Sequence, residues 1–294
     1  MTAAMAARHA AYLASSGPDA VARRAGALAA VEIGRSRQGR PIRAITIGTG
    51  GPATLVLGGI HPIEWIGVEV ALALAEAAAA RPPVDRRVVV VPLINPDGHA
   101  AVAADLAAGR RRWRRTNAAG VDLNRNFDVG HRAAPRRRLP HLPHAGEWPR
   151  SEPEIAAVAA LAERLPVDRA VALHSFGRMI LLPWAHRGAR APRWDAVHAH
   201  AAAVAAALAA RGAGRYRVLH TGRWPLFRPG GLELDWLTAR GALAMLVECA
   251  GGGLAATRPA TWLDPFAWYN PADPATHAAM IAGGLGGFVT GAAG

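Results

Sequence analysis

The chain contains no lysine and only one cysteine, Cys249. A single cysteine excludes an internal disulfide and a zinc cluster built from several cysteines, and it is typical of a reducing compartment. No apolar run approaches the roughly 20 residues needed to cross a membrane. Arginines and a histidine interrupt the alanine-rich N-terminus before the apolar core of a secretory signal could form. We therefore expect a soluble, cytoplasmic protein without a membrane partner.

Because lysine is absent, all 34 basic residues are arginines, and the formal net charge at pH 7 is +13. Such a surplus is typical of proteins that bind nucleic acid or an anionic surface. The arginines accompany an excess of alanine throughout the sequence, however, and no aromatic stacking platform or known binding motif lies near them. The densest clusters, residues 110–115 and 136–138, are expected to be solvated loops. We expect no nucleic acid partner, and salt-sensitive DNA binding would contradict this expectation.

Short β-branched runs alternate along the chain with alanine-rich helical stretches. This alternation predicts an α/β fold, with one domain built on a sheet covered by helices. The expected strands are Ile42–Ile47, Thr54–Leu57, Arg87–Leu93, Ala170–Leu173 and Leu243–Val247. The expected helices are approximately Glu64–Ala80, Glu152–Arg164, Trp194–Arg211 and Pro274–Phe288. Residues 130–150 are rich in Arg, Pro and His and lack periodicity, which predicts a long surface loop at the edge of the active site.

A histidine and a glutamate follow the second expected strand. The segment Gly58-Gly59-Ile60-His61-Pro62-Ile63-Glu64 leaves an apolar run and opens a helix. At this junction, His61 and Glu64 can present one nitrogen and one carboxylate to a single ion at the carboxyl edge of the sheet. The motif alone is equally compatible with a surface histidine and an ordinary acidic first turn of a helix.

Two further polar residues, His174 and Glu248, end apolar strands. Two histidines and a glutamate are a standard ligand set of catalytic zinc, which leaves one position open for water. His174 can therefore complete the set begun by His61 and Glu64. A carboxylate at the tip of a buried strand requires a partner, and beside a metal-bound water Glu248 would be a general base. The simpler alternatives are a hydrogen-bonded histidine and an ion pair of Glu248 with an arginine.

Arginines also cluster around an Asn/Asp-rich segment. The sequence runs Trp113-Arg114-Arg115-Thr116 and, shortly after, Gly120-Val121-Asp122-Leu123-Asn124-Arg125-Asn126-Phe127. Arginine binds carboxylates with two hydrogen bonds, and it stabilises the oxyanion that forms when water attacks a carbonyl. An arginine in one of these two segments is thus a candidate for catalysis, and an arginine in the other is a candidate for anchoring a substrate carboxylate. A basic loop capped by a turn is the alternative.

Taken in order, these features resemble the M14 family of zinc carboxypeptidases. The resemblance extends to Ile33–Ser36, Gly39–Ile42, Asn95–Gly98, Ser151–Glu154, Gly230-Gly231 and Asp235-Trp236. It implies a zinc carboxypeptidase-like catalytic domain over residues 31–294, preceded by a short helical lead-in over residues 1–30. It further implies a mixed, mostly parallel central sheet with helices on both faces.

The resemblance also implies roles for the residues around the metal. His61, Glu64 and His174 would bind one zinc ion. Glu248 would be the base that activates water and passes the proton to the leaving amine. Asp122 would orient the first histidine, a support that metal-bound histidines generally have.

Other matching residues would bind the substrate. Arg114 would polarise the scissile carbonyl, and Arg115 is the alternative and a candidate substrate contact, because the loop is shorter than in the digestive enzymes. Asn124 and Arg125 would hold the terminal carboxylate. The peptide bond after Ser175 is expected to be cis, as in relatives.

One departure from the family concerns specificity. The family places a mobile tyrosine shortly before the Gly-Gly of its specificity loop, and Phe227 or Leu226 falls there in this sequence. Neither has a hydroxyl, so substrate preference need not be that of the classical peptidases. Leu234, before Asp235, indicates an apolar floor of the specificity pocket, and Glu233 beside it indicates an acidic wall instead. Phe227 and Leu234 are therefore candidate substrate contacts.

The predicted function is zinc-dependent hydrolysis of a peptide or amide bond next to a free carboxylate. The expected partner is a peptide or acyl-amino-acid substrate, and the oligomeric state is left open. One alternative is a cell-wall murein peptide amidase or diamino-acid peptidase, which share Gly-Val-Asp-Leu-Asn-Arg-Asn-Phe. Another is an N-acyl amino acid deacylase of the same superfamily.

Overall fold

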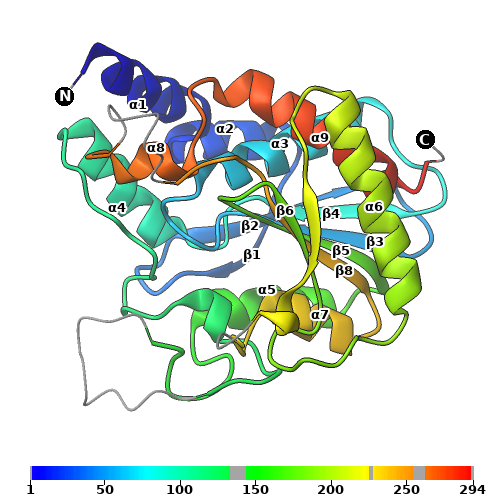
Figure 1. The fold of residues 1–294 in the computed structure, drawn as a ribbon. Helices are drawn as coiled ribbons and strands as arrows, with labels where there is room; N and C mark the ends of the chain where they lie inside the picture. The colour runs from blue at the N-terminus through cyan, green and yellow to red at the C-terminus, as the bar shows by residue number, and fades with distance from the viewer. Residues whose placement is uncertain (1, 133–143, 225–227, 254–261, 293–294) are drawn as a thin grey trace.

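Eight strands form one central sheet in the computed structural model, which describes residues 2–132, 144–224, 228–253 and 262–292 (Figure 1). The strands are β1 (Val31–Arg35), β2 (Pro41–Ile47), β3 (Ala53–Leu57), β4 (Arg87–Val91), β5 (Val167–His174), β6 (Met179–Leu182), β7 (Arg217–His220) and β8 (Leu243–Glu248). Their order across the sheet is β1-β2-β4-β3-β5-β8-β6-β7.

The middle of the sheet is parallel. Strands β4, β3, β5 and β8 pair in parallel, as do β6 and β7, whereas β1–β2, β2–β4 and β6–β8 pair antiparallel. All residues of β3 are buried, because helices cover both faces, and this explains its continuous apolar sequence. The expected mixed, mostly parallel sheet is therefore confirmed.

The expected strands correspond to β2, β3, β4, β5 and β8, although β4 ends at Val91, before the predicted end. The sequence patterns missed β6 and β7, which have four residues each. Runs this short carry too little periodicity to be distinguished from loops. Strand β1 lies at an edge of the sheet with largely exposed residues, and only the family resemblance indicated it.

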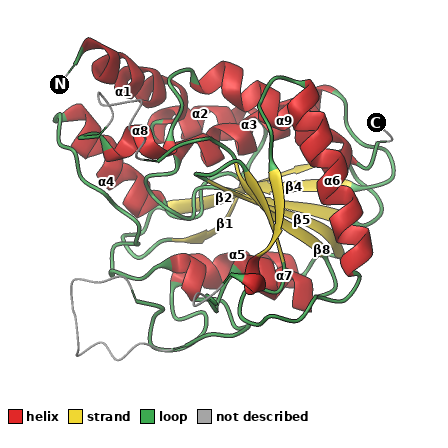
Figure 2. Cartoon of the chain, in the orientation of Figure 1, coloured by secondary structure: helices red, strands yellow, loops and turns green. Residues whose placement is uncertain are grey.

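Helices pack against both faces of the sheet (Figure 2). The helices are α1 (Ala3–Ser16), α2 (Pro18–Ala27), α3 (Trp65–Ala80), α4 (Pro96–Ala107), α5 (Pro153–Glu163), α6 (Trp194–Ala210), α7 (Glu233–Ala239), α8 (Pro265–Tyr269) and α9 (Pro274–Thr290). One core cluster joins the sheet to α2, α3, α6 and α9, and a second joins it to α5 and α7. The four predicted helices correspond to α3, α5, α6 and α9.

The N-terminal helices pack onto the rest of the domain through aromatic contacts. Tyr12 in α1 is fully buried, and its ring meets the edges of Trp65 and Phe266. His9 Nε2 lies 3.2 Å from Asp264 Oδ2, which joins α1 to the start of α8. Helix α1 thus shares a core with Phe266, which lies more than two hundred positions later in the sequence.

The described residues contain no helix that is long and apolar enough to cross a membrane. Only the ends of the loop expected over residues 130–150 are described, and the arginine cluster at 136–138 lies outside the described residues.

Candidate active site

The carboxyl ends of β3, β5 and β8 meet at one edge of the sheet, because these neighbouring strands are parallel. The loop after β3 carries His61 and Glu64, and β5 ends at His174. Glu248 ends β8 and lies directly beside His174 in the strand register. Sheet topology therefore brings together residues that are up to 187 positions apart, as Glu248 and His61 are.

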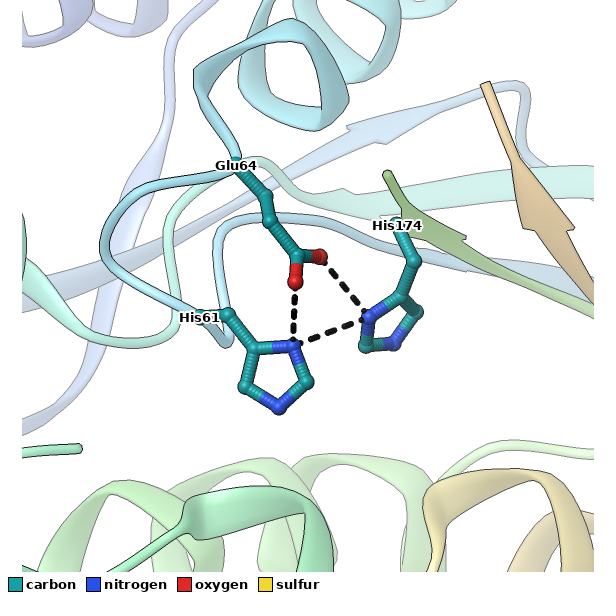
Figure 3. A group of neighbouring side chains, drawn as sticks. All are labelled: His61, Glu64 and His174. Atoms are coloured by element: carbon teal, nitrogen blue, oxygen red, sulfur yellow. Dashed lines mark hydrogen bonds and ion pairs between the residues drawn. The ribbon is translucent and has the colours of Figure 1, made fainter. Parts of the chain in front are cut away.

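His61, Glu64 and His174 point toward one another (Figure 3). His61 Nδ1 is 2.8 Å from Glu64 Oε1, and His174 Nδ1 is 3.0 Å from Glu64 Oε2. The two Nδ1 atoms are 3.2 Å apart. Each of the three residues is only 3% exposed. Because one potential ligand atom from each residue lies within 4.8 Å of the others, the group could hold a metal ion.

Two glycines allow the backbone to bring these ligands together. Gly59, in the loop after β3, has a φ of +62°, a conformation that favours glycine. Gly67, in α3, lies against β5, where an added Cβ would sit 2.8 Å from the carbonyl oxygen of Leu173. The absence of a side chain lets α3, which begins directly after Glu64, approach the strand that ends at His174.

Each imidazole points Nδ1 toward the other ligand candidates and Nε2, its outer nitrogen, toward a buried carboxylate. His61 Nε2 is 3.2 Å from Asp122 Oδ1, and His174 Nε2 is 2.5 Å from Glu233 Oε1. Metal-bound histidines are typically held in this way, because the carboxylate orients the ring and leaves the inner nitrogen unprotonated. The family resemblance implied such a position for Asp122, whereas Glu233 was expected only as an alternative acidic wall of the specificity pocket. The side-chain direction of Glu233 depends on where α7 begins, which the sequence pattern does not fix.

The carboxylates of Asp122 and Glu64 are ionised near neutral pH. Burial opposes the charge of Asp122, but Arg115 and His61 hold the pKa of Asp122 well below its usual value. Burial likewise opposes the charge of Glu64, and here His61 and His174 lower the pKa. The positive and negative groups of the site therefore stabilise one another inside the protein.

Glu248 has the opposite environment. Burial, and then the negative charge of Glu64, raise the pKa of Glu248 to about 8. Its Oε2 is buried and has no hydrogen-bond partner among the described residues. A carboxyl group that exchanges its proton near neutral pH suits general acid–base catalysis.

Arg115, rather than Arg114, faces the ligand cluster. Arg115 Nε donates a hydrogen bond to Asp122 Oδ2 at 2.7 Å, and its Nη1 is 4.0 Å from Glu64 Oε1. Arg114 Nε instead donates to Asp105 in α4 at 2.6 Å. The family resemblance gave Arg114 as the residue beside the scissile carbonyl and Arg115 as the alternative, and of the two it is Arg115 that lies beside Glu64. The segment is neither helix nor strand, so no regular side-chain period indicates which of the two neighbouring arginines faces the cluster.

Asn124 and Arg125 lie beside the same cluster, in a short 3-10 helix over Leu123–Arg125. Asn124 Oδ1 accepts the backbone N–H of Glu233 at 3.1 Å, and its Nδ2 is 3.4 Å from His174 Nε2. Arg125 Nη1 donates to the carbonyl of Asn124 at 2.6 Å. Burial lowers the pKa of Arg125, while Asp122 and Glu233 oppose this effect.

Tyr269, at the end of α8, is a site neighbour that the sequence patterns missed. Its hydroxyl accepts a hydrogen bond from Trp113 Nε1 at 2.9 Å, and its ring meets the edge of Phe176. Burial raises the pKa of Tyr269, with smaller contributions from Glu64 and Glu248. The only available signal was the dense aromatic run around residues 266–269.

The remaining expectations concern the peptide bond after Ser175 and the residues of the specificity pocket. The peptide bond between Ser175 and Phe176 is cis, as expected. Leu234 is 1% exposed and packs in the core between α7 and the sheet. Phe227 and Leu226 lie outside the described residues.

The charged groups of the site are compatible with the binding of a divalent cation. Four carboxylates and two guanidiniums interact around the two imidazoles: Glu64, Asp122, Glu233, Glu248, Arg115 and Arg125. With both imidazoles neutral and Glu248 ionised, which are not the states that the raised pKa values of His174 and Glu248 favour in the metal-free protein, negative charges exceed positive ones by two. One divalent cation would balance this excess.

Comparison with known sequences identifies similar proteins. A sequence model described as zinc carboxypeptidase matches residues 18–252. Zinc carboxypeptidase A 1 of Anopheles gambiae is 28% identical over 225 residues, which are 70% of this chain and 51% of that protein. Carboxypeptidase A1 of Bos taurus is 30% identical over 177 residues, which are 53% of this chain and 41% of that protein. The chain spans about half the length of the curated relatives it matches.

Solved structures with the same fold include carboxypeptidase A from Helicoverpa armigera. The TM-score is 0.74 at 21% identity, covering 93% of this chain and 72% of that one. A murein-tripeptide amidase from Escherichia coli O157 aligns with a TM-score of 0.51 at 21% identity, covering 83% of this chain and 91% of that one. Both alignments support a shared fold.

Proposed function

This chain belongs to the zinc carboxypeptidase family, and on that premise we propose that it is a zinc-dependent hydrolase. It cleaves a peptide or amide bond next to a free carboxylate. The observation that carries the proposal is the buried group of His61, Glu64 and His174, with Glu248 at the adjacent strand end. Residues in this arrangement supply both a metal site and a base.

The ligand atoms fit zinc. Zinc bonds to histidine nitrogen at about 2.0–2.1 Å, so two nitrogens on a tetrahedral zinc ion are about 3.3 Å apart. The two Nδ1 atoms of the histidines are 3.2 Å apart. Two histidines and a glutamate are also a known ligand set of catalytic zinc. A bound zinc ion would supply Lewis acidity, which polarises a carbonyl and favours the ionisation of water.

Glu248 is the proposed general base. It accepts a proton from the attacking water and passes it to the leaving nitrogen. Arg115 stabilises the negative charge that develops on the carbonyl oxygen, because its guanidinium already lies beside Glu64 and Asp122. Because the site is buried, the electrostatic effects of Glu248 and Arg115 on the reacting atoms are stronger than they would be in water.

Arg125 and Asn124 are the proposed contacts of the substrate carboxylate. Among the described residues, Arg125 makes one hydrogen bond, from Nη1, so that other N–H groups can pair with an anion. Asn124 Oδ1 is engaged by Glu233, which leaves Nδ2 as the donor.

A panel of substrates tests the proposal. Peptides with a free C-terminal carboxylate are expected to be hydrolysed at least about 100-fold faster, in kcat/KM, than the same peptides with an amidated C-terminus, because two arginine–carboxylate bonds are lost. Muropeptide fragments and N-acyl amino acids complete the panel. Exclusive cleavage of muropeptides would identify the murein amidase alternative, and exclusive cleavage of N-acyl amino acids would refute the peptidase proposal.

Replacing each neighbouring arginine with alanine tests which one polarises the carbonyl. Arg115→Ala is expected to lower kcat/KM by about 100-fold or more, the usual cost of removing one oxyanion donor. Arg114→Ala is the matched control and should stay within a few-fold of the wild type, because Arg114 pairs with Asp105. Steady-state kinetics and thermal melts of both variants provide the comparison. The reverse ranking would return the role to Arg114.

Zinc affinity is expected to fall as the pH falls. Burial opposes the protonation of His174, but Glu233 and Glu64 raise the pKa of His174 well above its usual value in the metal-free protein. A raised pKa favours the ring that is protonated on both nitrogens, and the proton on Nδ1 must leave before zinc can bind there. Competition titrations with a chelator between about pH 6 and about pH 8 measure the effect. An affinity that stays constant across this range would contradict the expected proton release.

A further inference from the structure

Glu233 is a buried carboxylate that contacts a metal-ligand candidate directly. It is the first residue of α7, is 1% exposed, and places Oε1 2.5 Å from His174 Nε2. A glutamate in the first turn of a helix usually interacts with the helix N-terminus and with water. Here the side chain is withdrawn from solvent and meets the imidazole instead.

The hydrogen-bonding groups around His174 determine where its proton lies. Two polar atoms approach Nε2: Glu233 Oε1 at 2.5 Å and Asn124 Nδ2 at 3.4 Å. An amide nitrogen can only donate, so the carboxylate is the acceptor and Nε2 carries the hydrogen. In the neutral ring, Nδ1 is then unprotonated. Its lone pair faces Glu64 and His61, where a metal ion would bind.

The backbone holds Glu233 in this position. Its N–H donates to Asn124 Oδ1 at 3.1 Å. The preceding turn is fixed to the same segment, because the N–H of Phe127 donates to the carbonyl of Gly231 at 3.1 Å. Gly231 has a φ of +71°, and an added Cβ there would lie 2.0 Å from the carbonyl oxygen of Arg125. The start of α7 is therefore attached to the segment that also carries Asp122.

We propose that Glu233 is a positioning residue for His174, equivalent in function to Asp122 for His61. It fixes the tautomer and the ring orientation of the second histidine and strengthens that histidine as a zinc ligand. The proposal rests on the proposed zinc-dependent function. The two carboxylates differ in their environment, since Asp122 is paired with Arg115, whereas Glu233 Oε2 has no hydrogen-bond partner among the described residues. The negative charge of Glu233 is therefore compensated less than that of Asp122, and it acts more strongly on the imidazole of His174.

This role also bears on substrate preference. With Oε1 on His174 and almost no exposed surface, Glu233 is not free to pair with a cationic substrate side chain. Glu233 therefore acts on the metal site and does not select basic side chains.

The test is the zinc affinity of Glu233→Gln, measured by chelator competition. Loss of such a carboxylate partner typically weakens metal binding by about 10- to 100-fold, and the same loss is expected here. The matched control is Glu154→Gln, which changes a fully buried glutamate in the first turn of α5 that has no contact with the metal-ligand candidates. This control should keep the wild-type zinc affinity, even if its melting temperature falls. At saturating zinc, Glu233→Gln should change kcat more than KM.

The outcomes separate this inference from the proposed function. Wild-type protein that binds no zinc would refute the proposed function. Wild-type protein that binds zinc, together with Glu233→Gln of unchanged affinity, would overturn only the role of Glu233. If the variant does not fold, nitrogen-15 NMR of the wild-type histidines decides the question. A proton on His174 Nε2 in the zinc-loaded protein supports the inference, and zinc coordination through Nε2 overturns it.

Discussion

Glu248→Gln is expected to lose nearly all turnover while still binding zinc. Glutamine has the same shape as glutamate but cannot accept the proton of the attacking water, and a positioned general base typically contributes about 10²- to 10⁴-fold. Burial and Glu64 raise the pKa of Glu248 to about 8 in the metal-free protein, so the wild-type group exchanges protons near neutral pH. Measurement of kcat and of bound zinc on the same samples checks both parts of the prediction.

Glu154→Gln is a suitable control here as well, because it removes a buried carboxylate outside the site. It should retain activity. Substantial activity in Glu248→Gln would refute the assignment of the base. Loss of zinc from Glu248→Gln would instead show that Glu248 is a ligand.

His174→Ala is expected to lose both metal and activity. His174 contributes one of the three facing candidate ligand atoms, and its Nε2 contacts Glu233 on the other side of the ring. Removal of a ligand should weaken zinc binding by more than the roughly 100-fold that loss of a ligand's supporting partner costs. His61→Ala should behave in the same way. Elemental analysis after dialysis, combined with an activity assay, measures the effect.

His99→Ala provides the comparison for a buried histidine outside the site. His99 stacks on Trp65 and contacts the carbonyl oxygen of Ser16 through Nε2 at 2.7 Å. Its loss should lower the melting temperature but leave the zinc content unchanged. A His174→Ala variant that kept wild-type zinc content would exclude His174 as a ligand.

The sequence allowed the prediction that His61, Glu64, His174 and Glu248 lie together, because each of them borders a recognisable element. His61 and Glu64 stand between an apolar strand and a helix, and His174 and Glu248 end apolar strands. In a largely parallel sheet, such ends meet at one edge. The α/β fold class follows from patterns that a single sequence contains, whereas the mixed, mostly parallel arrangement of the strands was implied by the family resemblance.

Other parts of the site depend on contacts that no pattern encodes. Which of Arg114 and Arg115 faces the metal-ligand candidates differs by one residue in a loop, and it depends on the positions of Asp105 and Asp122. Glu233 and Tyr269 reach the site from α7 and α8, whose positions depend on packing over the whole domain. The short strands β6 and β7 were missed because four residues carry little periodicity.

The zinc content of the wild-type protein tests the central claim most directly. Protein purified without chelators should contain one zinc ion per chain, lose peptidase activity when the metal is removed, and regain it when zinc is restored. Protein that contains no zinc, and whose activity does not respond to added zinc, would contradict the role assigned to His61, Glu64 and His174.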